Sequence, residues 1–379
     1  MYSNRIVLFV FTLCLFACTS PKEKPVVNEV DSPLYLIVGS YSDGTTPGIS
    51  VYNFESRTGD FEYVSDVKGV VNPSYLVVSP DEQFIYSVNE TGNGAVSSFT
   101  FDKTTGTLSL INYQFTEGAD PCYININKEA TFIVTANYSG GNISVFPLSR
   151  KGCIEPLSQK IDFSKEGDLV PSHIHTVVFS PDGKYLYATD LGKDKIYTFI
   201  VAGKDDEARL YETVNSTVEL KSGSGPRHLA FSPDEKFIYS INELAGTVAA
   251  FEYNEGIRSN IQYIASDTTP GVGEKGSADI HLTPDGRFLY ASNRLKADGI
   301  AIFSVHPETG ILTKTGYQET GIHPRNFLIS PNGKFLLCAN RDSHTVQIFT
   351  INPETGLLQF TGKEIVVDKP VCLKWIANI

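Results

Sequence analysis

Short apolar runs separated by polar turns recur along most of the chain. In residues 223–253 the runs LAF, FIYSI and TVAAFEY are separated by a Ser-Pro-Asp turn and an Asn-Glu-Leu-Ala-Gly turn. Runs of this length, bounded by Pro, Asp, Asn and Gly and rich in β-branched and aromatic residues, predict consecutive antiparallel strands. The stretch 223–253 therefore predicts one antiparallel sheet unit.

The same unit is repeated at a nearly constant interval. The proline of the Ser-Pro-Asp turn, or Lys128 in one degenerate copy, recurs at intervals of 48, 53, 52, 51 and 47 residues. These six positions are Pro80, Lys128, Pro181, Pro233, Pro284 and Pro331. Nine residues after each stands an Asn or Asp, at Asn89, Asn137, Asp190, Asn242, Asn293 and Asn340. A repeat of about 50 residues with four strands predicts an all-β fold, the β-propeller.

The two ends of the chain together supply a seventh copy. The N-terminal runs LYLIVGSY, GISVYNF and FEYVSDV read as three strands, and the C-terminal run PVCLKWI reads as the missing first strand. A blade split between the termini closes a ring, because each end is held by pairing with the other. In an open solenoid the two ends of the chain are capped separately and do not pair, so a repeat split between them argues against that fold. We therefore predict a seven-bladed propeller of four-stranded antiparallel blades.

The N-terminus is typical of an exported protein. Arg5 precedes an apolar stretch from Ile6 to Phe16 that is too short to span a membrane comfortably and fits a signal peptide. The stretch ends in Leu-Phe-Ala-Cys, which resembles the lipobox of bacterial lipoproteins with Cys18 as the lipidated residue. We predict a signal peptide at 1–17, a tether at 18–33 and a single propeller domain at 34–379. An uncleaved anchor is the alternative.

Composition and charge narrow the possible partners. The chain has 379 residues, 41% of them hydrophobic, and a formal net charge of −12. That charge argues against nucleic acid and against an anionic membrane surface as partners, so we expect membrane contact only through the lipid anchor. The cysteines form neither a C-x-x-C pair nor a zinc spacing. A disulfide between Cys338 and Cys372 is permitted by export, but buried free thiols are the favoured interpretation.

Internal repetition separates scaffold from candidate site. The strand-ending Asn or Asp and the Ser-Pro-Asp turns recur in most copies, so we interpret them as structural. Three other positions change type from copy to copy. The position after the strand-ending residue holds Tyr41, Glu90, Tyr138, Leu191, Glu243, Arg294 and Arg341. The second position of the first strand holds Ser74, Cys122, His175, Arg227, Ala278, Arg325 and Val371. The next position holds Tyr75, Tyr123, Thr176, His228, Asp279, Asn326 and Cys372.

All three variable positions are expected at one mouth of the central channel. The start of the first strand and the end of the second lie at the same end of an antiparallel blade, and the first strand is innermost. Four arginines converging there in an acidic protein indicate an anionic ligand, since guanidinium binds carboxylate or phosphate bidentately. Arg–Glu pairs that brace neighbouring blades are the alternative. His281, His306, His323 and His344 lack this convergence and are expected to be surface or structural residues.

The sequence resembles the lactonase family of seven-bladed propellers, which includes bacterial propeller-type 6-phosphogluconolactonases and fungal carboxy-muconate cyclases. The segments GPRHLAFSPDEKFIYSINEL and HPRNFLISPNGKFLLCANRDSHTV carry the most specific likeness, and the match extends from about residue 35 to 376. The family's proposed active-site residues are a histidine, two arginines and a glutamate. The resemblance places them at His175, Arg227, Glu243 and Arg294. Further substrate-binding candidates are His173, His228, Arg325, Asn326, Arg341 and Glu90.

The resemblance implies hydrolysis of a sugar-acid δ-lactone. Either Glu243 or His175 could activate water and an arginine could stabilise the oxyanion, without cofactor, metal or covalent nucleophile. A Ca²⁺-assisted lactonase using Glu90 and Glu243 is a remote alternative. We expect a monomer whose ligand is a small anionic lactone or sugar acid. Export argues against a phosphorylated substrate, because 6-phosphogluconolactone is not made outside the cytoplasm. A muconate-cyclase-like activity, or a non-catalytic propeller that binds a glycan or protein, remains open.

Overall fold

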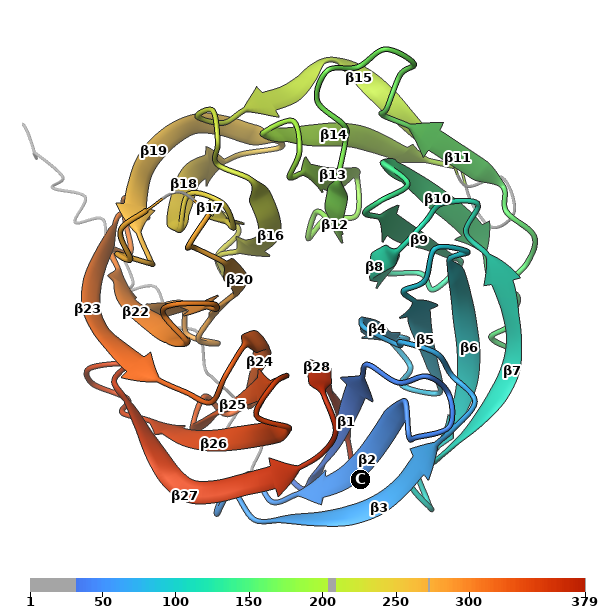
Figure 1. The fold of residues 1–379 in the computed structure, drawn as a ribbon, viewed down its shortest axis with the longest axis vertical. Coiled ribbons are helices and arrows are strands. Elements are labelled where there is room, and N and C mark those ends of the chain that lie inside the picture. The colour runs from blue at the N-terminus through green and yellow to red at the C-terminus, as the bar shows by residue number, and fades with distance from the viewer. Residues whose placement is uncertain (1–31, 204–208, 272, 379) are drawn as a thin grey trace, which may run out of the picture.

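Seven four-stranded antiparallel sheets form a ring around a central channel (Figure 1). This is a computed structural model that describes residues 32–203, 209–271 and 273–378. We number the blades I to VII, beginning with the sheet β28-β1-β2-β3 and continuing in chain order from β4–β7 to β24–β27. The predicted all-β, seven-bladed propeller is thereby confirmed.

The two inner strands of each blade carry the most regular part of the repeat. The innermost strands are β28 (Pro370–Ala377), β4 (Leu76–Val78), β8 (Pro121–Ile126), β12 (Ile174–Phe179), β16 (Pro226–Phe231), β20 (Ser277–Leu282) and β24 (Pro324–Ile329). The second strands are β1 (Leu34–Ser40), β5 (Phe84–Asn89), β9 (Phe132–Asn137), β13 (Tyr185–Asp190), β17 (Phe237–Asn242), β21 (Phe288–Asn293) and β25 (Phe335–Asn340). Most second strands are almost wholly buried.

The two outer strands complete each blade and vary more in length. The third strands are β2 (Ile49–Phe54), β6 (Ala95–Asp102), β10 (Asn142–Pro147), β14 (Lys195–Ala202), β18 (Thr247–Tyr253), β22 (Gly299–Val305) and β26 (Thr345–Ile351). The outermost strands are β3 (Phe61–Val67), β7 (Thr107–Phe115), β11 (Gln159–Asp162), β15 (Arg209–Glu219), β19 (Ile257–Ala265), β23 (Leu312–Glu319) and β27 (Leu358–Val366).

Blade I closes the ring by joining the two ends of the chain. Strand β28 pairs with β1 in an antiparallel register that sets Leu34 opposite Ala377 and Val38 opposite Leu373. Blade I packs on blade VII, where the Phe54 ring lies 5.8 Å from that of Phe335. The predicted closure by a split blade is confirmed.

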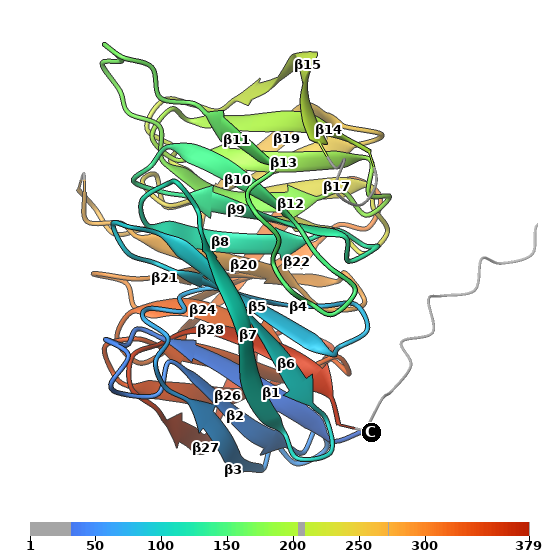
Figure 2. The same ribbon diagram turned by 90° about the vertical axis from the view of Figure 1, so that its right-hand side faces the viewer.

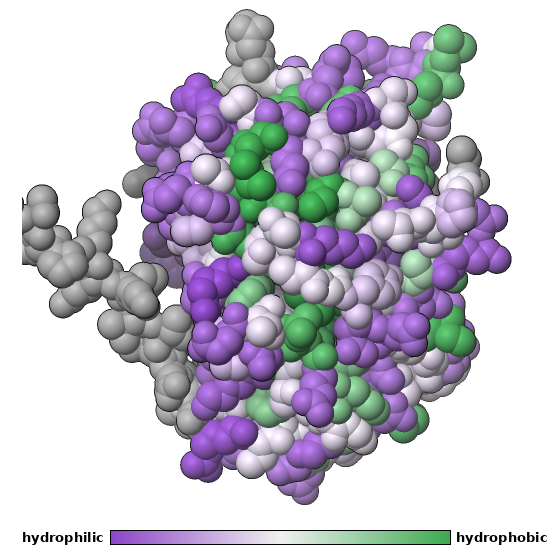
Figure 3. Space-filling view, turned by 90° about the vertical axis from the view of Figure 1, so that its left-hand side faces the viewer, coloured by the Kyte–Doolittle hydropathy of each residue, from purple (hydrophilic) through white to green (hydrophobic). Residues whose placement is uncertain are grey.

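The hydrophobic core lies between the blades. The cluster between blades V and VI, for example, joins Tyr239 and Phe237 to Leu289 and Phe303, all of them buried. Burial of both faces of the inner strands explains why these strands are nearly continuous apolar runs. The outer edge seen beside β19 and β23 is mostly hydrophilic with scattered hydrophobic patches (Figure 3).

The Ser-Pro-Asp turns are structural, as predicted. The Ser232 hydroxyl donates to Asp234 Oδ1 at 2.7 Å and accepts the Phe237 N–H at 3.0 Å. The same pair of bonds recurs around Ser79 and Ser180. Since each turn satisfies its own polar groups, it can be repeated without help from the rest of the blade.

The strand-ending Asn and Asp residues are also structural. Asn242 is fully buried, accepts the Ser240 hydroxyl at 3.1 Å and donates to Thr247 Oγ1 at 3.0 Å. Asp190 likewise accepts the Ser172 hydroxyl at 2.7 Å. These side chains fix the turn between the second and third strands, and the prediction is confirmed.

The described chain begins on the face opposite the candidate mouth. Leu34 pairs with Ala377 at the end of β28, whereas the mouth residues belong to the start of β28 (Figure 2). The predicted signal peptide, Cys18 and nearly all of the tether lie outside the described residues. In the described ranges no helix has the length and apolarity needed to cross a bilayer. Cys338 and Cys372 are buried free thiols, as favoured from the sequence.

Candidate active site

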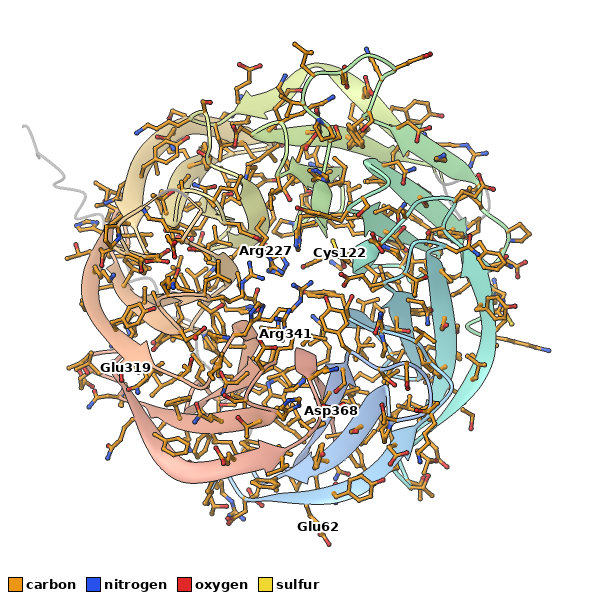
Figure 4. The ribbon with its side chains drawn as sticks, in the orientation of Figure 1. Glu62, Cys122, Arg227, Glu319, Arg341 and Asp368 are labelled. Carbon is orange, nitrogen blue, oxygen red and sulfur yellow. The ribbon has the colours of Figure 1, made fainter. Side chains whose placement is uncertain are left out.

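The three variable positions of the repeat form three tiers around one end of the channel. We call the residues after the second strands the rim tier, the second residues of the innermost strands the middle tier, and the residues that follow them the floor tier. Figure 4 shows Arg341 of the rim and Arg227 and Cys122 of the middle tier near the centre of the ring, while Glu62 and Glu319 lie at its outer edge.

A β-bulge at the start of the innermost strand positions the middle-tier residues. Pro226 pairs with Asn242 and His228 pairs with Ile241, so Arg227 is an extra residue in the ladder between β16 and β17. The same shift occurs around Cys122, His175 and Arg325 in their own blades. Because a bulge interrupts the alternation of side chains, two consecutive residues can both be directed toward the channel.

Two arginines from different blades share one carboxylate. Glu243 Oε2 lies 2.9 Å from Arg227 Nε, and its Oε1 lies 3.0 Å from Arg294 Nη2. Burial alone raises the pKa of Glu243, but the charges of Arg294 and Arg227 outweigh it and hold the pKa below 4.5. Burial lowers the pKa of Arg294 to about 10, which leaves it charged at neutral pH. The cluster therefore carries one surplus positive charge.

Arg227 keeps one donor free of protein acceptors despite its burial. Its side chain is 2% exposed, and its Nη1 donates to the Ala278 carbonyl at 2.6 Å. The Nε–H is not aligned with Glu243 despite the short contact and has no hydrogen-bond partner within the described chain. An unsatisfied N–H at a buried guanidinium is a donor that a ligand can use.

His175 is a neutral, buried imidazole in the middle tier. Its ring lies 5.2 Å from that of His228 and 5.6 Å from that of Tyr138. Burial, followed by the charge of Arg227, holds the pKa of His175 well below 6.5. Its Nδ1 is buried without a hydrogen-bond partner among the described residues. A buried nitrogen of this kind is available to a ligand or to water.

A second ion pair occupies the opposite side of the mouth. Arg325 Nη2 lies 3.6 Å from Glu90 Oε2, and the Tyr41 hydroxyl donates to Glu90 at 3.0 Å. Burial lowers the pKa of Arg325, but Tyr41 and Glu90 outweigh it and raise the pKa overall. Tyr41 occupies the variable position that follows the second strand, but it is not among the candidate site residues predicted from the sequence.

His323 is a correction to the sequence-based prediction. It was expected to be a surface or structural residue, yet its Nδ1 lies 3.2 Å from Arg341 Nη2 and its Nε2 lies 3.5 Å from Arg294 Nη1. Burial, with the charges of Arg294 and Arg341, lowers its pKa to about 3. His323 precedes Pro324 just as His173 precedes Ile174, so one more repeat position would have revealed it.

The remaining predicted residues surround this cluster. His173 is stacked on Tyr138, with ring centroids 4.5 Å apart. Arg341 forms a bidentate pair with Asp342. His228 and Asn326 lie in the floor tier, where both contact Asp279.

His281, expected to be a surface or structural residue, contacts the other oxygen of Asp279 at 3.0 Å, which agrees with a structural role. Its imidazole comes from two residues further along β20, a position that the three variable series did not include.

The floor tier fills the channel below the mouth. The rings of Tyr75 and Tyr123 are stacked 3.9 Å apart, and the His228 ring packs edge-on against that of Tyr123 at 5.2 Å. On the other side, Leu76 N–H donates to Cys372 Sγ at 3.3 Å. In the residues that the structure describes, no group of three or more His, Cys, Asp or Glu side chains is placed to hold a metal ion.

Comparison with known proteins decides the family. Residues 35–375 match the family described as lactonase, seven-bladed β-propeller. The chain belongs to the lactonase family. It is thereby a lactone hydrolase, and the three tiers are its candidate active site.

Several relatives of this lactonase are known by sequence or structure. A 6-phosphogluconolactonase of Formosa agariphila is 37% identical over 82% of this chain and 90% of its own length. A crystal structure of a candidate 6-phosphogluconolactonase from Bacteroides fragilis is 50% identical, with a TM-score of 0.86 over 91% of this chain and 98% of that one. The structure of a periplasmic gluconolactonase from Pseudomonas aeruginosa is 33% identical, with a TM-score of 0.85 over 92% of this chain and 100% of that one.

The shared carboxylate makes a prediction about stability. Replacing Glu243 with Gln should lower the melting temperature, because Arg227 and Arg294 lose their common counter-ion. Breaking a buried ion pair typically costs about 3–5 kcal/mol, and we expect the lower end because the Glu243 side chain is 23% exposed. The folded pKa lies below 4.5, so this stabilisation is complete above pH 4.5 and is lost as the pH falls through the folded value.

Calorimetric melts of wild type and Glu243→Gln should therefore differ most near neutral pH and converge in acid. The exposed Glu62→Gln change at the outer edge is the matched control and should leave the melting temperature within experimental error. Equal melting temperatures of wild type and Glu243→Gln near neutral pH would contradict the buried-pair assignment.

Proposed function

We propose that the protein hydrolyses a sugar-acid δ-lactone at the three tiers, with water as the nucleophile. The observation that carries this proposal is a cluster of unsatisfied buried polar atoms. Ser74 Oγ, His175 Nδ1, Thr176 Oγ1 and Arg227 Nε are buried without hydrogen-bond partners within the described chain, and all four belong to the middle and floor tiers. Five further atoms of this kind lie elsewhere in the described chain, but these four share two tiers at one end of the channel, which favours a small polar ligand over a flat protein- or glycan-binding face.

His175 is the better candidate for the general base. Both oxygens of Glu243 are engaged by arginines, and the low pKa of this carboxylate makes it a weak proton acceptor. The low pKa of His175 in the free enzyme also opposes protonation, but the negative charge that develops on the lactone during attack offsets the charge of Arg227. His175 can therefore take the proton of the attacking water as the oxyanion forms.

Arg227 is placed to stabilise the oxyanion. Its Nε–H lies beside Glu243 Oε2 without forming an aligned hydrogen bond to any described residue, and its guanidinium is held in place by Glu243, Ala278 and His228. A donor that is already oriented acts without reorganisation when charge develops on the carbonyl oxygen. Arg294 and Arg325, on either side, are proposed to hold the substrate.

Direct attack by water is preferred to a covalent intermediate. The Cys122 thiol lies in the middle tier, but burial raises its pKa and its Sγ lies 3.4 Å from the His175 carbonyl, to which a protonated thiol can donate. A buried thiol that stays protonated is a poor nucleophile.

The roles of His175 and Arg227 are tested by two substitutions. His175→Gln should lower kcat by about 10²- to 10⁴-fold, the usual contribution of a general base. Arg227→Lys should lower kcat by about 10²- to 10³-fold, because lysine keeps the charge but not the oriented N–H. Both are measured as lactone hydrolysis above the spontaneous rate, with circular dichroism to check the fold.

The exposed His306→Gln change is the matched control and should retain wild-type kcat. If His175→Gln kept kcat within about threefold of wild type while Glu243→Gln lost activity, then Glu243 and not His175 would be the base.

The charge balance at the mouth favours an unphosphorylated lactone. The guanidinium groups of Arg227, Arg294, Arg325 and Arg341 are opposed by the carboxylates of Glu243, Glu90 and Asp342. These groups leave one surplus positive charge, which the Asp279 carboxylate of the floor tier opposes, so the three tiers match a neutral aldonolactone and hold no cationic excess for a phosphorylated one. A phosphate monoester would bring a further charge of about −1.5 to −2. The Pseudomonas relative is a gluconolactonase, in line with this choice, whereas the Formosa relative is a 6-phosphogluconolactonase.

A panel of lactones tests this preference. We expect kcat/KM for glucono-δ-lactone to equal or exceed that for 6-phosphoglucono-δ-lactone, with heat-inactivated protein giving the spontaneous rate. A kcat/KM at least tenfold higher for the phosphorylated lactone, about 1.4 kcal/mol of preferential binding, would overturn the charge argument and leave the hydrolase assignment intact.

We also propose that the protein is exported and lipid-anchored through Cys18, on the periplasmic side or at the outer membrane. The sequence before the propeller supports this, and the chain enters the ring opposite the mouth, so that an anchor there leaves the mouth unobstructed. The periplasmic location of the Pseudomonas relative agrees with export. The monomeric state remains a prediction.

Anchoring is tested by metabolic labelling with a clickable fatty acid, followed by fractionation. Wild-type protein should be labelled and found with membranes, whereas Cys18→Ala should lose the label. Cys153→Ala, in the propeller, is the control and should remain labelled. Unlabelled wild-type protein in the cytosolic fraction would contradict the proposal.

A further inference from the structure

Asp279 is a buried carboxylate at the centre of the floor tier. It lies on β20, is 1% exposed, and its Oδ1 lies 2.7 Å from His228 Nδ1. Its Oδ2 accepts from Asn326 Nδ2 at 2.5 Å and from the Phe327 N–H at 3.2 Å. His228, Asp279 and Asn326 come from three successive blades.

The contacts of His228 determine which of its nitrogens carries the proton. His228 Nε2 lies 3.1 Å from Arg227 Nη1, and a guanidinium can only donate. Nε2 must therefore be the acceptor, so Nδ1 carries the hydrogen and donates it to Asp279. Burial, with the charge of Arg227, lowers the pKa of His228 to about 3, in agreement with a neutral ring that holds one proton.

We propose that Asp279 is a positioning residue for lactone hydrolysis. By holding the proton of His228 on Nδ1, it presents the Nε2 lone pair to Arg227 and so fixes the guanidinium whose Nε–H makes no aligned hydrogen bond within the described chain. Asp279 itself does not touch the substrate. This inference rests on the proposed role of Arg227 and extends it to a residue two contacts away.

The surroundings of Asp279 make Asp279→Asn an unusually specific test. Asn326 donates toward Oδ2 and is itself held by the Leu373 N–H, which donates to Asn326 Oδ1 at 2.8 Å. Oδ2 faces Asn326 Nδ2, the Phe327 N–H and His281 Nε2, whereas Oδ1 faces the Ile280 N–H and His228, so we expect the amide oxygen of the new Asn at the Oδ2 position. Its NH₂ group then faces His228, which has to accept through Nδ1 and carry its proton on Nε2. Two donors, from His228 and Arg227, would then oppose each other.

The experiment combines kinetics with histidine spectroscopy. Asp279→Asn should lower kcat for lactone hydrolysis by about 10- to 100-fold, the range usual for removing a group that orients a functional side chain, with a smaller change in KM. In ¹⁵N-histidine-labelled protein, the His228 signals should show a protonated Nδ1 in wild type and a protonated Nε2 in the variant. A merely structural carboxylate would give the same exchange of tautomers without the fall in kcat, so the two readouts together test the positioning role.

His281→Gln is the matched control, because it alters a partner of the same carboxylate on the Oδ2 side without contact to Arg227. It should leave kcat and the His228 tautomer unchanged. Asp279→Asn also deprives the Ile280 N–H of its acceptor. If this variant fails to fold, His228→Gln, which keeps an acceptor near the Nε2 position, should retain more kcat than His228→Asn, which does not.

An unchanged kcat or an unchanged His228 tautomer in folded Asp279→Asn overturns the inference, as does equal activity of the two His228 variants. Failure of the proposed function gives a different result. Wild-type protein would then open no lactone of the panel, while the tautomer exchange between wild type and Asp279→Asn would still be observed.

Discussion

Pairing between β28 and β1 is the interaction on which the rest of the structure depends. It supplies the innermost strand of blade I, and with it Val371 and Cys372 of the middle and floor tiers. The same strand is connected to the active site, because the Leu373 N–H holds Asn326 and Asn326 holds Asp279. Closure of the ring and orientation of Arg227, the proposed oxyanion donor, are therefore parts of one hydrogen-bonded system.

The sequence predicted the fold because the fold is periodic. Each blade needs its own Ser-Pro-Asp turn and its own strand-ending Asn or Asp, so these residues recur at intervals that can be counted. In the structure Ser232 and Asn242 satisfy polar groups of their own blade. Their roles follow from local chemistry, and a single sequence is enough to find them.

The candidate site was predictable by position but not by contact. Repeat positions placed Arg227, Glu243 and Arg294 at one mouth, and the structure joins them. Which residues touch depends on the rotation from one blade to the next, as in the 51-residue separation between His228 and Asp279. Asp279 was visible in a variable series, but its role depends on partners from the blades on either side.

His323 was missed for a related reason. It lies two residues before Arg325, the first position compared on that strand, and its backbone has a positive φ of 62°, which is uncommon for a residue other than glycine. Asn72 and Asp120 have similar values at the equivalent position, so this conformation belongs to the blade entry and brings the side chain to the mouth. A backbone property of this kind leaves no hydrophobic or polar pattern in the sequence.

The energetics explain how such a site can exist in a stable protein. A buried polar atom without a partner costs about 1–3 kcal/mol, so the four in the middle and floor tiers together cost about 4–12 kcal/mol. That is comparable with the whole net stability of a typical domain, about 5–15 kcal/mol. The fold can offset it because most recurring residues, such as Ser232 and Asn242, are satisfied within their own blade and the apolar faces are buried between blades. The unsatisfied groups at the mouth are confined to positions that the scaffold does not need, where a bound lactone can supply their missing partners.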